Sequence, residues 1–196
     1  MEGQARSWAI LPYTGLSLKG HDGLHLAERQ LRTLLSGANE KVEPVQSTLD
    51  AVVLRAPNGS RVQPVQVSVS EKDGLVGDRW SLGKANVGDQ VSMMNLDVAH
   101  AFANGQSVVL FGDNLFTRLD LSTSALPIGA QLKIGPAVFE VSATPHVPCG
   151  QFRSRFGSAA FRLAAKEPRL RGVYLTVRKG GDIRIGDAIS VVVPIS

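Results

Sequence analysis

The chain has 196 residues, of which 43% are hydrophobic, so we expect one domain with a real core, or one domain with an extension. A single cysteine excludes an internal disulfide and any zinc or iron–sulfur site built from several cysteines. No apolar run follows the first residues or is long enough to cross a bilayer, so we expect neither a signal peptide nor a membrane-spanning segment. A free thiol without an export signal indicates a cytoplasmic protein.

The net charge of +4 is concentrated toward the C-terminus. Residues 151–184 contain nine lysines and arginines but only two acids, whereas the rest of the chain is slightly negative. A basic segment of this kind predicts an anionic partner, either a nucleic acid or a small phosphorylated ligand. Aromatic residues make up only 6%, and the sequence has no helix-turn-helix pattern, zinc spacing or aromatic stacking motif. Nucleic acid is therefore the less favoured partner.

The first 46 residues predict an extension that carries one amphipathic helix. Residues 1–23 are rich in glycine and irregular, and we expect a loop there. Apolar residues then recur at helical spacing from Leu24 to Leu35, with charges between them, and Gly37 ends the pattern. The apolar stripe favours packing against the main domain over recruiting a partner.

Residues 47–196 form the predicted main domain, whose pattern is mainly β. The expected strands cover residues 51–55, 65–69, 90–94, 131–134, 137–141, 172–177, 182–185 and 189–193, with an extended piece over 112–121. Short helices are expected over 96–103, capped by Asn95 and ended by Asn104 and Gly105, and over 158–166. Many short strands and few helices are typical of a β-barrel or a closed sandwich.

The only cysteine, Cys149, lies in a segment that predicts a loop over residues 144–157. Pro148 and Gly150 flank it and keep it out of a helix interior or a central strand, so its thiol can meet solvent or a ligand. Positive charge nearby favours the thiolate, which is the form that attacks and binds metals. Arg153 and Arg155 follow closely and supply such charge.

Each residue of this segment also has a structural interpretation. A lone cysteine is usually a small buried hydrophobe, yet loops carry function more often than cores do, so both interpretations of Cys149 stay open. His146 taken alone favours a structural role. Arg153 and Arg155, two positions apart, can be solvated charges on one face of an extended segment.

Two turn motifs are further candidates. The runs GDR (77–79) and GDNL (112–115) place polar side chains on glycine-flanked turns. Asp78 can orient the backbone of its own turn, and Asn114 tolerates left-handed conformations, so a turn role and a site role stay open for both. The sequence has no phosphate-binding GxxxxGK[ST] run, no GxGxxG followed by a helix, no HExxH and no GxSxG. Cys149 is therefore the strongest chemical candidate.

The order of these pieces resembles the MOSC domain, the module named after the C-terminal part of molybdenum-cofactor sulfurases. The likeness runs from about residue 50 to the C-terminus. The matching segments are EKDGLVGDRW (71–80), VSMMN (91–95), GDNL (112–115), LPIGAQLKIG (126–135), PC (148–149) with Phe152, RFG (155–157), LRGVY (170–174) and IRIGD (183–187). Each motif is weak alone, but their number, order and spacing make the resemblance specific.

The resemblance implies a MOSC-type β-barrel with a few short helices over residues 47–196 and one functional cysteine, which falls on Cys149. In characterised relatives this cysteine binds the molybdenum of the pterin cofactor or carries sulfur for it. Some relatives reduce N-hydroxylated compounds, including purine bases. The chain looks like the stand-alone bacterial type, without aminotransferase-like, ferredoxin or separate N-terminal β-barrel domains. Many look-alikes have glycine before the cysteine, whereas Pro148 follows the wider family pattern.

The cofactor implied by the resemblance is molybdopterin, and physical chemistry suggests which residues hold it. Cys149 is the expected metal ligand and catalytic residue, because a soft thiolate suits a metal already bound by sulfur. His146 is the second catalytic candidate, as a donor to an oxo group or a proton relay. Arginine forks bind phosphate at two points. The candidates for cofactor binding are Arg79, Arg153, Arg155 and Arg171, together with Asp78 and with Asn114 as a hydrogen-bond partner of the pterin.

Three functions stay open at this point. The favoured one is an oxidoreductase that reduces an N–OH group of a small molecule to N–H and takes electrons from an external donor protein, because the chain has no flavin or iron–sulfur motif of its own. The alternative is a carrier that holds a persulfide on Cys149 or only ferries the cofactor. A basic module for nucleic acid ranks last, and no membrane partner is expected. The oligomeric state is not predicted.

Overall fold

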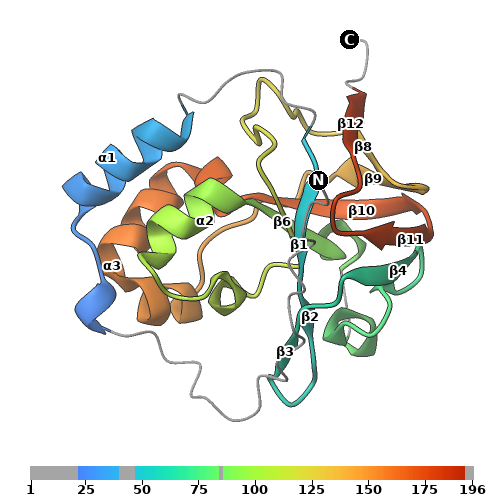
Figure 1. Cartoon of the computed structure of the whole chain (residues 1–196), viewed down its shortest axis with the longest axis horizontal. Helices are drawn as coiled ribbons and strands as arrows, with labels where there is room; N and C mark the ends of the chain where they lie inside the picture. The colour runs from blue at the N-terminus through green and yellow to red at the C-terminus, as the bar shows by residue number, and fades with distance from the viewer. Residues whose placement is uncertain (1–21, 40–46, 84–85, 193–196) are drawn as a thin grey trace, which may run out of the picture.

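The computed structural model describes residues 22–39, 47–83 and 86–192 of the chain. Within these ranges the protein is mainly β, with three α-helices (Figure 1). The helices are α1 (Glu28–Asn39), α2 (Leu96–Ala103) and α3 (Gly150–Lys166). Short 3₁₀ helices are η1 (Asp22–Leu24), η2 (Arg79–Leu82), η3 (Val87–Asp89), η4 (Val108–Phe111) and η5 (Pro168–Arg171).

Seven strands form one sheet that nearly closes into a barrel. In spatial order they are β1 (Leu49–Val52), β7 (Leu115–Thr117), β6 (Val91–Asn95), β10 (Val173–Lys179), β9 (Ala137–Val141), β8 (Gln131–Ile134) and β12 (Ile189–Val192). Neighbouring strands are antiparallel, except for β6 and β7, which are parallel and are connected through α2 and η4. The two edge strands meet where Thr48 bridges Ala188 and where the Leu49 N–H donates to the Asp187 carbonyl at 2.9 Å.

Two smaller sheets flank the barrel. One contains β11 (Gly181–Arg184), β4 (Gln66–Ser70) and β5 (Gly74–Leu75), and the other is the hairpin of β2 (Leu54–Arg55) and β3 (Arg61–Val62). The hairpin turns at Gly59, whose φ of +87° lies in the left-handed region that glycine tolerates. Because of this turn, Arg55 of β2 and Arg61 of β3 lie side by side as a cross-strand pair.

The hydrophobic core has two parts, one on each side of the sheet. Inside the barrel, alternate residues of β8 and β9 point inward, and Leu132 and Phe139 have no exposed surface. The second part lies between the other side of the sheet and the helices, which gather on one side of the barrel (Figure 1). Phe102, Phe116 and Phe152 are almost completely buried there. Each buried phenylalanine contributes about 1.5–3 kcal/mol, so this core fixes the helices against the barrel.

The predicted fold class is confirmed, and α2 is confirmed at both ends. The Asn95 side chain accepts hydrogen bonds from the N–H groups of Asp97 and Val98, and Asn104 ends the helix in the left-handed conformation with φ +45°.

The helix expected over 24–35 is present as α1 but covers residues 28–39. Because α1 shares the second core with α2 and α3, the division of the chain at residue 46 stays a prediction. Most of the loop expected over 1–23 lies outside the described residues.

The loop expected over residues 144–157 is wrong in its second half. α3 begins at Gly150, directly after the cysteine, and not at residue 158. Phe152 and Phe156, one helical turn apart, are buried in the second core and favour this helix. Gly157 interrupts it with φ +91° and ψ 166°, which breaks the helical period. The periodicity of the sequence therefore indicates only the part of α3 that follows the interruption.

Candidate functional site

Cys149 lies at the start of α3 with its side chain exposed. Its backbone is extended, with φ −103° and ψ 176°, and Gly150 is the first residue of the helix. The proline and glycine on either side thus keep the cysteine out of the helix interior, as the sequence predicts. The thiol is accessible to solvent and therefore to a ligand.

The turn over residues 110–112, at the end of η4, is held by arginines from three separate elements. Successive carbonyl groups of this turn each accept a hydrogen bond from one guanidinium group. The pairs are Arg155 Nη1 with Leu110 at 2.6 Å, Arg171 Nη2 with Phe111 at 3.4 Å, and Arg55 Nη1 with Gly112 at 3.4 Å. The turn therefore brings together side chains from α3, η5 and β2 that are far apart in the sequence.

Arg61 lies over the same turn and lacks a carboxylate partner among the described residues. It is 4% exposed, its Nη1 donates to the Gly59 carbonyl at 2.7 Å, and its buried Nε has no hydrogen-bond partner within the described residues. A Cβ placed on Gly112 would lie 3.5 Å from Arg61 Nη2. Burial lowers the pKa of Arg61 to about 10, and the positive charges of Arg79 and Arg155 add to this effect.

Arg79 and Arg155 complete a group that we call the arginine cluster (Arg61, Arg79 and Arg155). Arg79 is exposed and has no ion pair within the described part of the chain. Burial lowers the pKa of Arg155, the charge of Cys149 opposes this shift, and Arg79 contributes to it. Arg155 is thus within electrostatic range of both Cys149 and Arg79. Through Arg155 the cluster extends its positive charge toward the thiol, and charge of this kind can attract an anion.

Asp78 and Asn114 connect the two turn motifs of the sequence. The buried Asp78 carboxylate accepts from Arg55 Nη2 at 2.7 Å, from Asn114 Nδ2 at 3.0 Å and from the Trp80 N–H at 2.9 Å. Burial acts to raise the pKa of Asp78, but the hydrogen bonds and charge of Arg55 outweigh it and hold this pKa below its ordinary value. Asn114 also donates to the Val53 carbonyl at 3.1 Å. Both residues therefore have internal partners.

A second charged group, which we call the acid-paired cluster, contains Asp113, His146 and Arg171. Arg171 Nη1 donates to Asp113 Oδ2, and the Arg171 guanidinium carbon lies 5.4 Å from the centre of the Phe152 ring. His146 Nε2 is 3.6 Å from Asp113 Oδ1, and its ring centre is 4.2 Å from that of Tyr174. All three members of the cluster are buried.

Burial also decides the protonation state of His146. It lowers the pKa of His146 to about 3, the carboxylate of Asp113 opposes this shift, and the charges of Arg171 and Arg55 add to it. The imidazole is therefore neutral at pH 7. Its printed contacts are with Asp113 and Tyr174, and its catalytic role stays a prediction.

The structure thus brings most of the predicted residues to one region around residues 110–114. Arg153 is the exception among the arginines, because it is exposed and its Nε donates to Ser158 Oγ at 3.1 Å. Sequence reasoning missed Arg55 and Arg61. The only available signal was their position on both sides of the turn at 57–59, which no motif distinguishes from ordinary surface charge.

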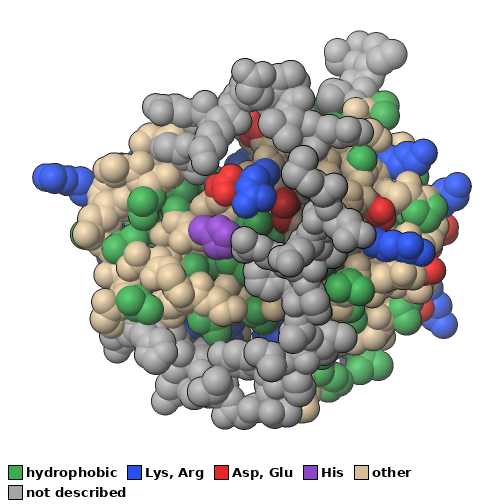
Figure 2. Space-filling view, viewed as in Figure 1, with side chains coloured by type: hydrophobic (Ala, Val, Ile, Leu, Met, Phe, Trp, Pro, Cys, Tyr) green, Lys and Arg blue, Asp and Glu red, His purple; other side chains and the backbone are tan. Residues whose placement is uncertain are grey.

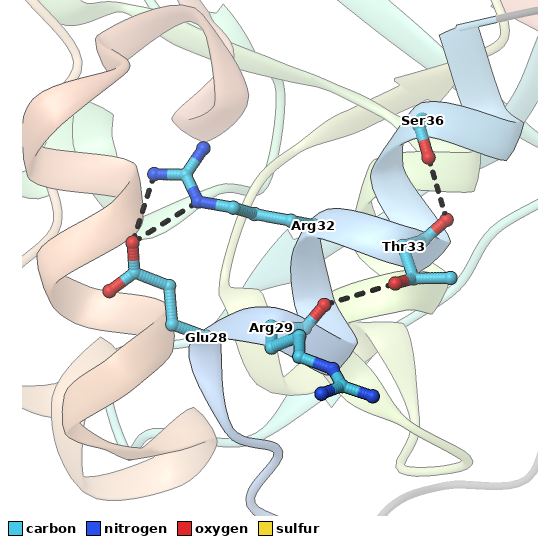
Figure 3. A pocket seen from close by; sticks show the side chains of 5 residues that line it. All are labelled: Glu28, Arg29, Arg32, Thr33 and Ser36. Carbon is cyan, nitrogen blue, oxygen red and sulfur yellow. Dashed lines mark hydrogen bonds and ion pairs between the residues drawn. The ribbon is translucent and has the colours of Figure 1, made fainter.

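The rest of the described surface gives weaker candidates. On the face shown in Figure 2, the Lys and Arg side chains are scattered among acidic and apolar ones and form no continuous basic patch. A shallow pocket runs along the exposed side of α1 and is lined by Glu28, Arg29, Arg32, Thr33 and Ser36 (Figure 3). None of the predicted site residues lines this pocket. In the described ranges, no helix has the length and apolar character that a membrane crossing requires.

The family model of the MOSC domain matches residues 89–190, which is more than half of the chain. The chain belongs to the MOSC domain family. This MOSC segment contains Asp113, Asn114, His146, Cys149, Arg153, Arg155 and Arg171, whereas Arg55, Arg61 and Arg79 precede it. The family is associated with the molybdenum cofactor. No curated protein matches the chain.

Solved structures support the MOSC fold. The YuaD protein of Bacillus subtilis is 18% identical with a TM-score of 0.60, and the match covers 74% of this chain and 94% of that one. The YiiM protein of Escherichia coli is 19% identical with a TM-score of 0.56, and the match covers 76% of this chain and 71% of that one. At these identities the likeness concerns the fold alone. Each match leaves about a quarter of this chain uncovered.

Proposed function

We propose that this MOSC protein binds the molybdenum cofactor and uses it to reduce N-hydroxylated compounds. The observation that carries the proposal is the exposed Cys149 thiol within electrostatic range of Arg155, a member of the arginine cluster. Arg61 and Arg79 have no carboxylate partner among the described residues, so the cluster has positive charge to offer an anionic ligand.

The residues present fit the chemistry of the cofactor. The Cys149 thiolate would hold the metal, because thiolates are soft ligands that suit a metal already bound by sulfur. The arginine cluster would hold the phosphate of molybdopterin, since a guanidinium fork matches two phosphate oxygens. The Nε of Arg61 is buried and has no hydrogen-bond partner within the described residues, and such an unsatisfied donor costs about 1–3 kcal/mol that a ligand would recover.

The bound cofactor would supply two-electron chemistry, and the chain would supply binding and orientation. In the overall reaction the substrate N–O bond breaks and an N–H bond forms, two electrons and two protons are consumed, and water leaves. Asp78 would hold Arg55 against the Gly112 carbonyl and so keep the turn beside the arginine cluster in place. The electrons would come from an external donor protein, because the sequence has no flavin or iron–sulfur motif.

The test compares the wild type with Cys149→Ser, both purified under reducing conditions from a cofactor-replete host. We expect molybdenum and pterin to copurify with the wild type and to be lost from the variant, because serine offers a hard and poorly ionised oxygen. Urea unfolding should give similar free energies for both, since Cys149 is exposed and contributes little to packing. A wild type without molybdenum would contradict the proposal.

The reaction is tested on the loaded protein with an N-hydroxylated adenine and a chemical electron donor. We expect conversion to adenine by the wild type and none by Cys149→Ser. Loaded wild type that does not turn over this base or a simple amidoxime would leave cofactor binding standing and remove the reductase proposal.

A carrier function is the second candidate, because the same exposed thiol can hold a persulfide. Intact mass after gentle purification separates the two functions. A gain of one sulfur atom that dithiothreitol removes, in protein without molybdenum, would favour the carrier.

A further inference from the structure

α3 is broken at Gly157, and the break is bridged by side chains from outside the helix. The carbonyl of Arg155, two residues before the break, accepts hydrogen bonds from His25 Nε2 at 3.0 Å and from Gln106 Nε2 at 3.2 Å. Carbonyl groups at the end of a helical stretch need partners of this kind. Gln106 follows α2, whereas His25 belongs to the N-terminal extension.

The His25 ring also packs directly on the break. A Cβ added to Gly157 would lie 2.9 Å from His25 Cγ, so the ring and the glycine backbone are in close contact. Gly157 has φ +91°, a conformation that favours glycine at this position. Only a residue without a side chain therefore permits both the break and the approach of His25.

The extension is firmly attached around His25. Leu31 and Leu35 are buried in the second core, and Asn104 Nδ2 donates to the Leu24 carbonyl at 3.0 Å. Arg32 pairs with Glu28 on α1, as Figure 3 shows, and its Nη1 also reaches Glu167 after α3 at 3.1 Å. These contacts fix α1 along α2 and α3 and hold residues 22–27, directly before it, in place.

We infer that the described part of the N-terminal extension, residues 22–39, supports the cysteine site, and that His25 is a positioning residue that acts through the backbone of Arg155. The stretch from Gly150 to the break starts at Cys149 and carries Arg155, so its orientation sets the distance between the thiol and the guanidinium group. His25 and Gln106 hold its C-terminal end from two sides. The positioning of the cysteine site matters for function only if the proposed function holds. The positioning itself is a property of the cofactor-free protein, and it is tested on that form.

The experiment measures the alkylation of Cys149, the only thiol, by iodoacetate and by iodoacetamide. Positive charge beside the thiol favours the anionic reagent, so the ratio of the two rates reports where the arginine cluster lies. In His25→Ala we expect this ratio to fall about threefold, because Arg155 moves away from the thiol. A loss of stability alone would change both rates together and leave the ratio unchanged.

Matched variants make the result decisive. His25→Gln keeps an N–H donor and should recover most of the ratio, and Gln106→Ala removes the other donor and should lower the ratio like His25→Ala. His100→Ala changes an exposed histidine of α2 and should behave as wild type. If His25→Ala does not fold, as judged by circular dichroism, Gln106→Ala and His25→Gln still test the inference. Folded Gln106→Ala and His25→Ala with the wild-type ratio would overturn it.

Metal analysis of the same proteins separates this inference from the proposed function. A wild type that binds no molybdenum, with a ratio that still falls in His25→Ala, removes the proposed function and supports the positioning role. A wild type that binds molybdenum, with ratio and loading unchanged in His25→Ala and Gln106→Ala, removes the positioning role alone.

Discussion

The two charged groups of the site are built from the same residue type but are balanced differently. In the acid-paired cluster, buried Arg171 has Asp113 as its partner and aromatic rings around it. In the arginine cluster, Arg61 and Arg79 have no carboxylate partner within the described residues, and Arg61 is as buried as Arg171. Removing one partner of a buried ion pair destabilises the fold, whereas a buried charge without a partner already costs stability and is a candidate for binding a ligand.

Both clusters contact the same turn, and successive residues of the turn contact one cluster or the other. The carbonyls of Leu110 and Phe111 accept from Arg155 and Arg171 respectively, and Asp113 then supplies the carboxylate. One short turn therefore contacts both the buried ion pair of Arg171 and Asp113 and the arginine cluster proposed to bind an anion. We therefore expect substitutions in the acid-paired cluster to change stability and substitutions in the arginine cluster to change anion binding.

The largest expected effect is that of Asp113→Asn on stability. The substitution leaves the charge of Arg171 buried without a partner, and breaking a buried pair costs about 3–5 kcal/mol. Urea unfolding measures the loss. The control is Glu140→Gln, which breaks a pair with Arg178 that is half exposed and should cost at most about 1 kcal/mol. Equal losses in the two variants would contradict the structural role of the acid-paired cluster.

The second effect is a dependence of stability on pH through His146. In the folded protein burial lowers its pKa to about 3, whereas the unfolded chain takes up the proton near 6.5. The unfolded state thus binds more protons between these values, so the free energy of unfolding falls by about 1.4 kcal/mol for each pH unit below 6.5.

Urea unfolding at pH 7 and pH 5 tests this dependence in the wild type and in His146→Gln. We expect the variant to lose about 2 kcal/mol less than the wild type over this range. The neighbours of His146 that also carry charge or titrate are Asp113, Arg171, Arg55 and Tyr174, and all of them are retained. His100→Gln, at an exposed position, should keep the wild-type dependence. The same slope in His146→Gln would show that His146 is not buried neutral.

The third effect is that of Arg61→Met on anion binding. Removing one charge-assisted contact should weaken the binding of inorganic phosphate about tenfold. The free energy of unfolding should change by less than about 1 kcal/mol, because the lost bonds to the turn at Gly59 are offset by the removal of a buried charge. Calorimetry and urea unfolding measure the two quantities. A large loss of stability with unchanged phosphate binding would place Arg61 with the structural residues.

The smallest effect is expected for Arg153→Ala. Arg153 is exposed and contacts Ser158 on its own helix, so stability should change by no more than about 0.5 kcal/mol. Phosphate binding should weaken less than in Arg61→Met. A tenfold loss in Arg153→Ala would instead extend the anion site along the exposed side of α3.

Local signals in the sequence were reliable where the physics is local. Asn95 and Asn104 cap α2 at the predicted residues, because capping depends on bonds within two to four positions. The first half of α3 was missed for the same reason, since Pro148 and Gly150 suggest a loop and Gly157 breaks the period. Only the burial of Phe152 and Phe156 against Phe111 shows why a helix forms there.

By itself, the sequence determined the mainly β class and the helix over 96–103. It also determined that Cys149 lies within a MOSC-like series of motifs and that Pro148 and Gly150 keep it out of a helix interior or a central strand. Only the tertiary structure decided that Arg61 lies within electrostatic range of Arg155, that His146 is buried and neutral, and that His25 reaches the break in α3. The reason is physical: turns and caps depend on neighbours in the chain, whereas burial and charge depend on residues that the nearly closed barrel brings together across long stretches of sequence.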